Sequence, residues 1–521
     1  MSVFSLEVQK ANPVTAEVLD NSLQALGVTL KEEEKDEYQR LLAVFHESVV
    51  GLMALPGKQL DLNYVPPVDE ERFPRQDIRF PDPSENPLGA WAWRCHVEDQ
   101  AQAGGLLAGK TVAVKDNIAV KGVPMLLGTD FVKDYVPNTD ATCVTRLLQE
   151  GAIIAGKSVC ENMCHSATSS SSSTGHVHNP HARGYSSGGS SSGSGALVAN
   201  GDVDMALGAD QGGSIRVPAG WCGLYGLKPT FGLVPYTACG SNEPTNDHVG
   251  PMTRTLLDNA LMLQVVAGND NIDDRSFAAP CPENVPKYYD DLAELDNPAD
   301  LSGFRVGVLT EAMSQPSVEH RVKACVEAAV HKLRDLGATV EEVSVPLHSQ
   351  GAAIWTAISK AGGYLAKRNL NFGRRGHAMT DLTAKFQHLT QQQWDAAYVS
   401  SRIIYLNGRL RDEYDAALDG FDVLVAPNLP YVANSHTPYD AAPLEKIGKQ
   451  VGLTANTAPF NQSGHPVLAM PIGMLAVEEG PLKGSGTKLP VSMQVIGKWW
   501  REEDVYRVAY AWSLKNDWKS G

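Results

Sequence analysis

The 521-residue sequence has no long hydrophobic run and few cysteines. No segment approaches the roughly 18 consecutive apolar residues that a membrane-spanning helix needs. The first residues, MSVFSLEVQKANP, lack the apolar core of a secretory signal. The eight cysteines include no C-x-x-C pair, which favours free thiols in a reducing compartment over a disulfide framework. We therefore expect a cytoplasmic protein that does not bind a membrane.

Positive charge is also scarce. The chain has 60 acidic and 44 basic residues, a formal net charge of -16, which argues against nucleic acid or an anionic membrane as the main partner. With 43% hydrophobic and 20% charged residues, the composition is ordinary for a globular protein, and the length allows two or three lobes. A small-molecule substrate fits this balance best.

The sequence contains no recognised metal-binding spacing. Two groups of potential ligands are close in sequence: Cys160, Cys164 and His165, and His176, His178 and His181. Neither group has the spacing of a zinc site, and the histidines fall in a predicted loop. We therefore predict neither a metal ion nor a cofactor.

An N-terminal helical region is predicted over residues 1–84. Apolar residues recur at helical spacing from Glu17 to about Ala54, and a proline-rich stretch follows to Leu88. Two amphipathic helices are too few to form a core, so their apolar faces need a partner. We expect this region to form a homodimer or a higher homo-oligomer.

The remaining residues, 85–521, predict an α/β domain with a smaller lobe at approximately 236–447. FRVGVL (Phe304 to Leu309), a helix near Glu319 to Leu336 and the strand ATVEEVSVP form a strand-helix-strand unit. TVAVK, FDVLVAP and LPVSMQVIG indicate further strands, and residues 350–420 look mainly helical. The expected fold is a mixed β-sheet covered by helices on both faces.

The stretch from Gly188 to Pro218 carries the strongest functional signal. Two turns rich in glycine and serine are joined by an apolar segment that predicts a helix running into a strand. Glycines let backbone N–H groups approach a reacting carbonyl, and serines provide an exposed oxygen. A flexible linker is the alternative, but ALVAN and VDMALGAD have no place in a linker.

Two short motifs in this part of the chain are poor guides. GAIIAGKS (Gly151 to Ser158) matches the P-loop pattern, yet its apolar interior favours a buried strand over a phosphate-binding loop. Gly184 to Gly188 and Gly189 to Gly193 match G-x-S-x-G, with Ser186 and Ser191 as would-be nucleophiles. No strand precedes them, as a nucleophile elbow requires.

Lys115, GGSSSG and DQGGSIRVPAGWCGLYGLKPTFG together resemble the amidase signature family, in order and in spacing, from about residue 85 to the C-terminus. The resemblance implies a catalytic triad of Lys115, Ser190 and Ser214. Ser214 would be the nucleophile, and Ser190, preceded by a cis peptide bond, would pass its proton to Lys115. A charged ammonium cannot accept a proton, so Lys115 is expected to be buried.

The resemblance also implies an oxyanion hole and a substrate pocket. The oxyanion hole would consist of four backbone N–H groups, those of Gln211, Gly212, Gly213 and Ser214. The substrate pocket would include Met163, Cys164, His165, Asp210 and Trp355, for each of which plain packing is the alternative. Arg216 is expected to form a structural ion pair with Asp210.

The predicted function is hydrolysis of small amides to a carboxylate and ammonia or an amine, through an acyl-enzyme on Ser214. The alternative is a urethane (carbamate), hydrazide or ester hydrolase with the same Ser-Ser-Lys site. A noncatalytic relative with this fold is disfavoured because all three triad residues are present. A glutaminase in a tRNA-charging complex is disfavoured by the N-terminal region and the acidic composition.

Overall fold

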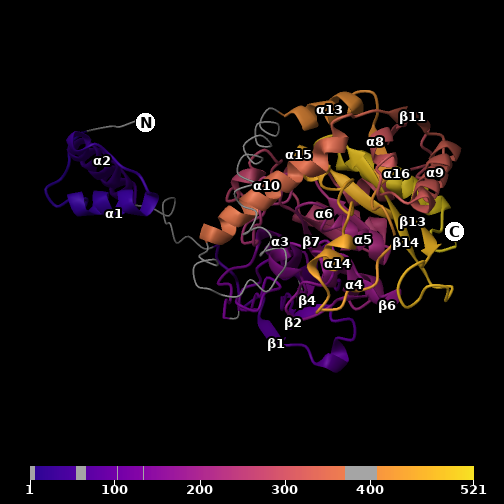
Figure 1. The fold of residues 1–521 in the computed structure, drawn as a ribbon. Coiled ribbons are helices and arrows are strands. Elements are labelled where there is room, and N and C mark those ends of the chain that lie inside the picture. The colour runs from indigo at the N-terminus through magenta and orange to yellow at the C-terminus, as the bar shows by residue number, and fades with distance from the viewer. Residues whose placement is uncertain (1–5, 54–65, 102–103, 133, 370–407, 521) are drawn as a thin grey trace. The chain divides into compact units, whose positions relative to one another are not determined.

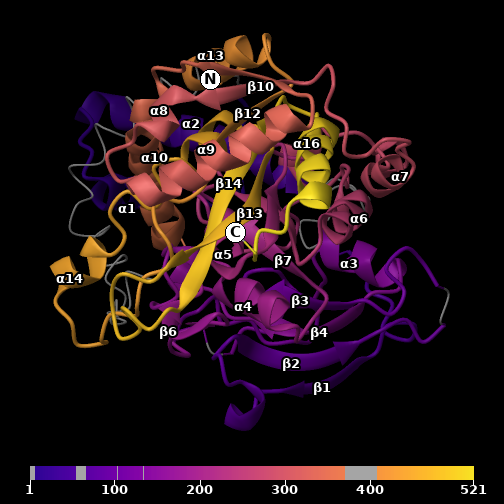
Figure 2. The same cartoon turned by 90° about the vertical axis from the view of Figure 1, so that its right-hand side faces the viewer.

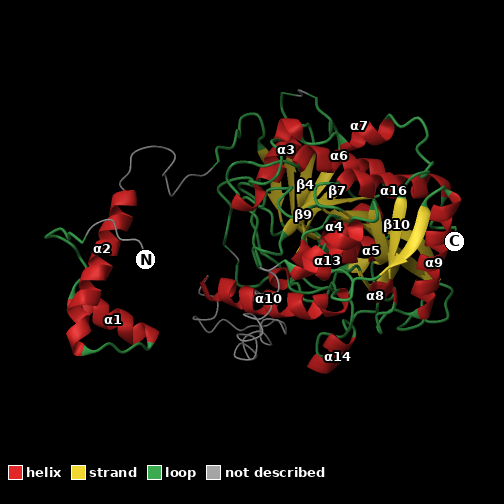
Figure 3. Ribbon diagram, turned by 90° about the horizontal axis from the view of Figure 1, so that it is seen from above, coloured by secondary structure: helices red, strands yellow, loops and turns green. Residues whose placement is uncertain are grey.

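The structure, a computed structural model, describes residues 6–53, 66–101, 104–132, 134–369 and 408–520. It divides into two units, Met1–Pro67 and Val68–Gly521. Figure 1 shows the course of the chain, and Figure 3 shows its helices and strands. None of the helices within the described ranges is long and apolar enough to cross a membrane.

The first unit contains two α-helices. Helix α1 (Ala16–Leu26) begins after Thr15, whose side chain accepts a hydrogen bond from the Val18 N–H, and ends at Gly27 in the left-handed conformation. A short 3-10 turn, η1 (Glu32–Glu34), leads into α2 (Lys35–Met53). Most large apolar side chains on this unit are exposed: Leu6, Val8, Val18, Leu26, Val28, Tyr38, Leu42, Phe45, Val49 and Val50. The helices therefore leave much of their apolar surface uncovered within the unit.

The boundary between the units lies at residue 67 rather than at residue 84. Strand β1 (Arg75–Arg79) pairs antiparallel with β2 (Trp91–Val97). Arg75 also forms an ion pair with the buried Asp140. The proline-rich stretch thus contributes an edge strand to the second unit, because prolines that flank a strand do not interrupt its hydrogen bonds.

The second unit is built on a twelve-stranded mixed sheet with the order β1-β2-β4-β3-β7-β9-β8-β13-β14-β12-β10-β11. Its strands β3 onward are β3 (Thr111–Lys115), β4 (Ile153–Ser158), β7 (Met205–Asp210), β8 (Tyr225–Lys228), β9 (His248–Thr253), β10 (Arg305–Leu309), β11 (Thr339–Val343), β12 (Val423–Pro427), β13 (Val467–Ala476) and β14 (Lys488–Gly497). Strands β4, β3 and β7 are parallel, as are β12, β10 and β11. A separate two-stranded sheet contains β5 (His178–Asn179) and β6 (Ala182–Ser186).

Helices cover both faces of the sheet, as predicted (Figures 1 and 2). They are α3 (Thr142–Gln149), α4 (Ser192–Asn200), α5 (Arg216–Cys222), α6 (Leu256–Val266), α7 (Tyr288–Ala293), α8 (Thr310–Met313), α9 (His320–Asp335), α10 (His348–Asn369), α13 (Arg409–Leu418), α14 (Pro443–Gly448), α15 (Pro459–Ser463) and α16 (Glu502–Lys515). Alternation along β3 shows the two faces. Val112 and Val114 pack in the cluster that holds α3 and α6, whereas Ala113 packs with α4 and α5. Lys115 follows the same alternation and so lies on the α4 face.

Residues 236–447 do not form a separate lobe. Strands β9, β10, β11 and β12 all belong to the large sheet, and the second unit is not divided. The predicted strand-helix-strand unit is present, since β10 and β11 pair in parallel from Arg305 opposite Thr339 to Leu309 opposite Val343, with α9 between them. The helical prediction for residues 350–420 holds for α10 and α13, and residues 370–407 lie outside the described residues.

Candidate active site

Two adjacent turns bring the predicted serines together. The first turn, residues 188–191, precedes α4, and the peptide bond before Ser190 is cis, as the resemblance implied. The second turn, residues 211–215, joins β7 to α5 and contains Ser214. The Ser191 N–H donates a hydrogen bond to the Ser214 carbonyl at 3.2 Å. This bond holds the two turns against each other.

The glycines after the first turn serve helix packing. A Cβ atom at Gly193 would lie 2.2 Å from the Ala90 carbonyl oxygen and 2.5 Å from the Val159 nitrogen. Helix α4 therefore approaches β2 and the end of β4 more closely than any other residue would allow. The run GGSSSGSG combines a tight turn with this close approach, which explains why it resembles a linker in composition.

Lys115 lies fully buried at the end of β3, behind the first turn. Its Nζ donates hydrogen bonds to Ser190 Oγ at 2.9 Å and to the Ala209 carbonyl at 3.0 Å. The neighbouring carboxylate, Asp116, pairs instead with Lys157 at 3.3 Å. No carboxylate in the described ranges forms an ion pair with Lys115. The geometry allows proton exchange between Lys115 and Ser190.

Asp210 organises the second turn. Its carboxylate accepts hydrogen bonds from the N–H groups of Gly213 (2.6 Å) and Ile215 (3.0 Å), from Arg216 and from Asn461. Burial opposes ionisation of this carboxyl, but the Arg216 charge and the hydrogen bonds outweigh it and hold the pKa of Asp210 well below its usual value. The expected ion pair between Asp210 and Arg216 is present, at 3.0 Å, with both side chains fully buried.

These contacts restrict which N–H groups are available to a substrate oxygen. The Gly213 N–H is already bonded to Asp210, so three of the four predicted donors remain. The Gln211 carbonyl accepts from Trp355 Nε1 at 2.6 Å. Because a trans peptide points its C=O and N–H in opposite directions, this bond sets the direction of the Gly212 N–H.

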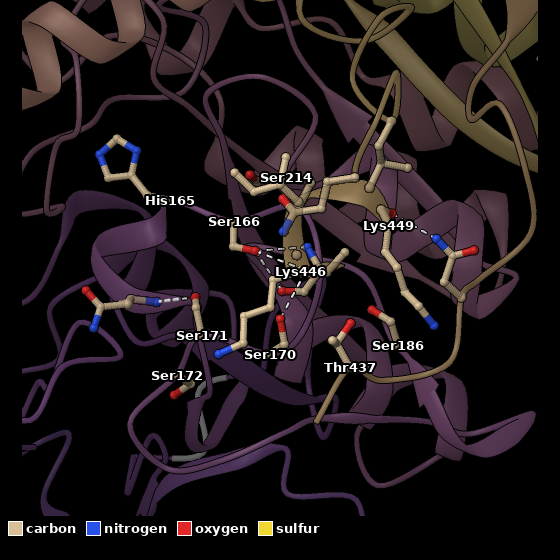
Figure 4. A pocket seen from close by; sticks show the side chains of 18 of the residues that line it. His165, Ser166, Ser170, Ser171, Ser172, Ser186, Ser214, Thr437, Lys446 and Lys449 are labelled. Carbon is tan, nitrogen blue, oxygen red and sulfur yellow. Dashed lines mark hydrogen bonds between the residues drawn. The ribbon is translucent and has the colours of Figure 1, made fainter. Parts of the chain in front are cut away.

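A cavity of about 590 Å³ opens beside the second turn (Figure 4). Ser214 is half-buried and lines it, whereas Lys115 and Ser190 are fully buried and do not. Of the five predicted pocket residues, three line the cavity: Cys164, His165 and Trp355. Met163 and Asp210 do not line it. Met163 is buried, and its N–H donates to the Leu127 carbonyl.

Cys164 lies closer to the buried serine and lysine than its sequence position suggests. A hydrogen bond with the Cys160 thiol lowers the pKa of Cys164 to about 7 against the effect of burial. The Lys115 charge and a hydrogen bond with Ser190 lower this pKa further. The pair that could have been read as metal ligands is therefore part of the wall around Ser190.

The sequence reasoning missed Glu161, which connects two parts of the site. Its carboxylate accepts hydrogen bonds from the N–H groups of Ser170 (2.9 Å) and Ser171 (2.7 Å) and from the Ser192 hydroxyl (3.1 Å). Its own N–H donates to the Ser190 carbonyl at 3.2 Å. Burial raises the pKa of Glu161 to about 7, and these hydrogen bonds limit the rise. Glu161 thus ties the first turn to the serine-rich segment ATSSSSST.

That serine-rich segment and the chain after β12 form the rest of the cavity wall. The lining side chains that the prediction omitted include Ser166, Thr168, Ser170, Ser171, Ser172, Ser173, His176, Thr437, Tyr439, Lys446 and Lys449. The run of serines was the only signal available for this wall. The G-x-S-x-G serines have structural partners: Ser186 accepts from the Gly188 N–H, and Ser191 bonds both the N–H and the carbonyl of Ala209.

Within the described ranges, no group of three or more His, Cys, Asp or Glu side chains is arranged to hold a metal ion. His176 is stacked between His436 and Tyr439, with ring centroids 4.3 and 4.2 Å away. His181 contacts the Cys222 carbonyl at 3.0 Å.

Comparison with known proteins places this arrangement. The Amidase family model matches residues 89–506. The chain is 39% identical over 451 residues to an enantioselective amidase of Rhodococcus rhodochrous, covering 82% of this chain and 83% of the relative. It is 32% identical over 454 residues to a glutamyl-tRNA(Gln) amidotransferase sequence of Thermosynechococcus vestitus, covering 82% and 89%.

Among solved structures, the native peptide amidase from Stenotrophomonas maltophilia has a TM-score of 0.64 and 27% identity, covering 79% of this chain and 83% of that chain. The fold and the matching sequences define an amidohydrolase, an enzyme that cleaves the C–N bond of amides. The chain belongs to the amidase signature family.

Proposed function

We propose that Ser214 attacks the amide carbonyl and forms an acyl-enzyme, with Ser190 and Lys115 as its proton relay. The observation that carries this proposal is the 2.9 Å hydrogen bond between the fully buried Lys115 and Ser190, next to the turn that presents Ser214 to the cavity. Serine is a weak nucleophile unless a base takes its proton. In this relay the Ser214 proton passes through Ser190 to an uncharged Lys115.

The protonated lysine then returns the proton, again through Ser190, to the departing nitrogen. The C–N bond breaks, and ammonia or an amine leaves. Water next attacks the acyl carbonyl while the same groups accept its proton, and the carboxylate product is released. Each step therefore uses Lys115 once as a base and once as an acid.

The negative charge that develops on the carbonyl oxygen is stabilised in this proposal by the N–H groups of Gln211, Gly212 and Ser214. Their positions are supported by the bond from Trp355 to the Gln211 carbonyl and by the bond from Thr457 Oγ1 to the Gly212 carbonyl at 2.7 Å. Donors fixed before the reaction stabilise the transition state without reorganisation. Gly213 acts indirectly, because its N–H secures the turn through Asp210.

The substrate class in this proposal is small-molecule amides, and the name of the Rhodococcus relative supports it. A panel of an aliphatic amide, an aromatic amide, a carbamate, a hydrazide and an aryl ester, assayed with one enzyme preparation, tests it. We expect the highest kcat/KM with one of the amides. A higher value with the carbamate would replace the amidase proposal with a urethanase.

We also propose that the enzyme is a cytoplasmic homodimer. The exposed apolar side chains of α1 and α2 support self-association through the first unit. The eight cysteines are free thiols, which supports a reducing compartment.

A further inference from the structure

The cavity is larger than a small amide requires. Its volume of about 590 Å³ lies in the range of pockets that enclose drug-sized ligands. Acetamide or a similar amide would occupy only the part next to Ser214. The remaining volume therefore accommodates a second portion of the substrate, and its lining indicates the chemistry of that portion.

Lys446 contributes a positive charge to this remote part. It lies on α14, and Figure 4 shows its side chain extending toward Ser170 and Ser172 along the serine-rich wall. Its Nζ donates to the Tyr439 carbonyl at 2.6 Å. In the parts of the chain that the structure describes, no carboxylate forms an ion pair with Lys446. The ammonium thus has donors left for a ligand.

The other charged residues of the cavity do not cancel this charge. Lys449 also lines the cavity but is paired with Glu479 at 3.2 Å. The lining includes one acidic residue, Asp130, and a third lysine, Lys360. Positive side chains therefore outnumber negative ones along the cavity, although the whole chain carries a net charge of -16.

The wall beside Lys446 is rich in hydroxyl groups. Thr168 Oγ1 lies 3.2 Å from Ser166 Oγ and 3.1 Å from Ser170 Oγ, and either atom of each pair can be the donor. Such a chain can turn a hydroxyl hydrogen toward an acceptor placed at its end. On the opposite side, the stack of Tyr439 on His176 fixes the residue whose carbonyl holds Lys446. An ammonium and hydroxyls together are the donors that bind a carboxylate most strongly.

We propose that this remote end, formed by Lys446 and the hydroxyls of Ser170 and Ser172, binds a carboxylate of the substrate. The preferred substrates are then amides that carry a carboxylate remote from the scissile bond. This inference rests on the proposed function, because it places the amide of the same molecule at Ser214.

Monoamides of linear dicarboxylic acids, in a series of increasing chain length, test the inference. Each acid is compared with a neutral amide of equal length that ends in a methyl ketone, and ammonia release gives kcat and KM. The enzymes are the wild type, Lys446→Gln and, as a matched control, Lys483→Gln, which changes an exposed lysine outside the cavity.

At the chain length that fits, we expect the wild type to prefer the acid. Lys446→Gln should lower kcat/KM for the acid by about 10-fold, mainly through KM, because a hydrogen bond to a charged group is lost. The neutral amide should be hydrolysed equally by all three enzymes, and Lys483→Gln should behave as the wild type. Hydrolysis without preference for the acid at any length, or an equal loss for both amides in Lys446→Gln, would overturn the inference and leave the proposed function intact.

A binding measurement separates the two proposals. Calorimetry with the linear dicarboxylic acids is performed on Ser214→Ala, with and without Lys446→Gln. Binding that disappears with Lys446→Gln supports the carboxylate site even if no amide in the series is hydrolysed, in which case the proposed function alone fails. Binding that is absent, or that is insensitive to Lys446, counts against the site.

Discussion

The two ends of the cavity are built differently. At the reactive end, Lys115, Ser190 and Asp210 are buried, and each is held by partners that include backbone groups. At the remote end, Lys446 is half-exposed, lies on a short helix and is held by its hydrogen bond to the Tyr439 carbonyl. Chemistry is thus fixed by close packing around the backbone, whereas the choice of substrate depends on side chains that are easily replaced.

The largest effect is expected for Ser214→Ala. Removal of the nucleophile should lower kcat by at least about 10³-fold, as in other serine hydrolases. The melting temperature should stay unchanged, because Ser214 is half-buried and contributes little core volume. Steady-state kinetics and thermal unfolding on the same preparation give both values. A variant with a tenth of the wild-type rate would show that another residue is the nucleophile.

Replacement of Lys115 tests the buried relay. Lys115→Ala and Lys115→Arg should both lower kcat, by about 10² to 10⁴-fold, because alanine has no base and arginine does not give up its proton. Lys115→Arg keeps a positive charge, so it separates proton transfer from electrostatic support. If Lys115→Arg keeps most of the activity, the lysine acts through its charge and the proposed relay is wrong.

The ion pair that orders the second turn should dominate stability at the reactive end. Asp210→Asn removes one partner of a fully buried pair, which should cost about 3 to 5 kcal/mol in the free energy of unfolding. The control is Glu341→Gln, which breaks the exposed pair with Arg305 and should cost at most about 1 kcal/mol. Denaturant unfolding of both variants makes the comparison, and equal losses would contradict this role for Asp210.

Glu161 should make stability depend on pH. Its pKa of about 7 in the folded protein lies above its usual value of 4.5, so the folded state binds the proton more tightly. Stability contributed by this group is therefore complete below pH 4.5 and is lost as pH rises through 7, by about 3 kcal/mol in total. Glu161→Gln should remove this decline from thermal unfolding curves.

Burial also raises the pKa of Asp247 to about 7, so Asp247→Asn is the matched control. That variant should lose its own share of the decline and keep the share of Glu161. An unchanged pH profile in Glu161→Gln would show that Glu161 does not titrate in this range.

The smallest effect on activity is expected in the first unit. Replacement of the exposed Leu42 and Phe45 by glutamate should convert a dimer to a monomer and leave kcat unchanged, because the predicted site lies within the second unit. Sedimentation of the full-length protein measures the association state. A dimer that persists in the double variant would move the interface elsewhere.

Local patterns were enough to predict much of the fold and the reactive end. The strand before Lys115, the parallel unit of β10, α9 and β11, and the two glycine-serine turns all show in short stretches of sequence. Strand β1 was missed because prolines surround it, and its pairing with β2 depends on residues further along the chain. The remote end was missed for the same reason: Lys446 and Ser170 meet only after β12 and the serine-rich segment fold onto one cavity.

The carboxylate of Glu161 has a consequence for how this enzyme can acquire new substrates. It holds the serine-rich wall through Ser170 and Ser171 and the relay turn through Ser192, so a substitution in that wall also disturbs the catalyst. The opposite wall, residues 434–450, is not fastened to the relay by any such bond among the described residues. Laboratory evolution of substrate range should therefore accumulate its successful changes in residues 434–450 and spare the run of serines.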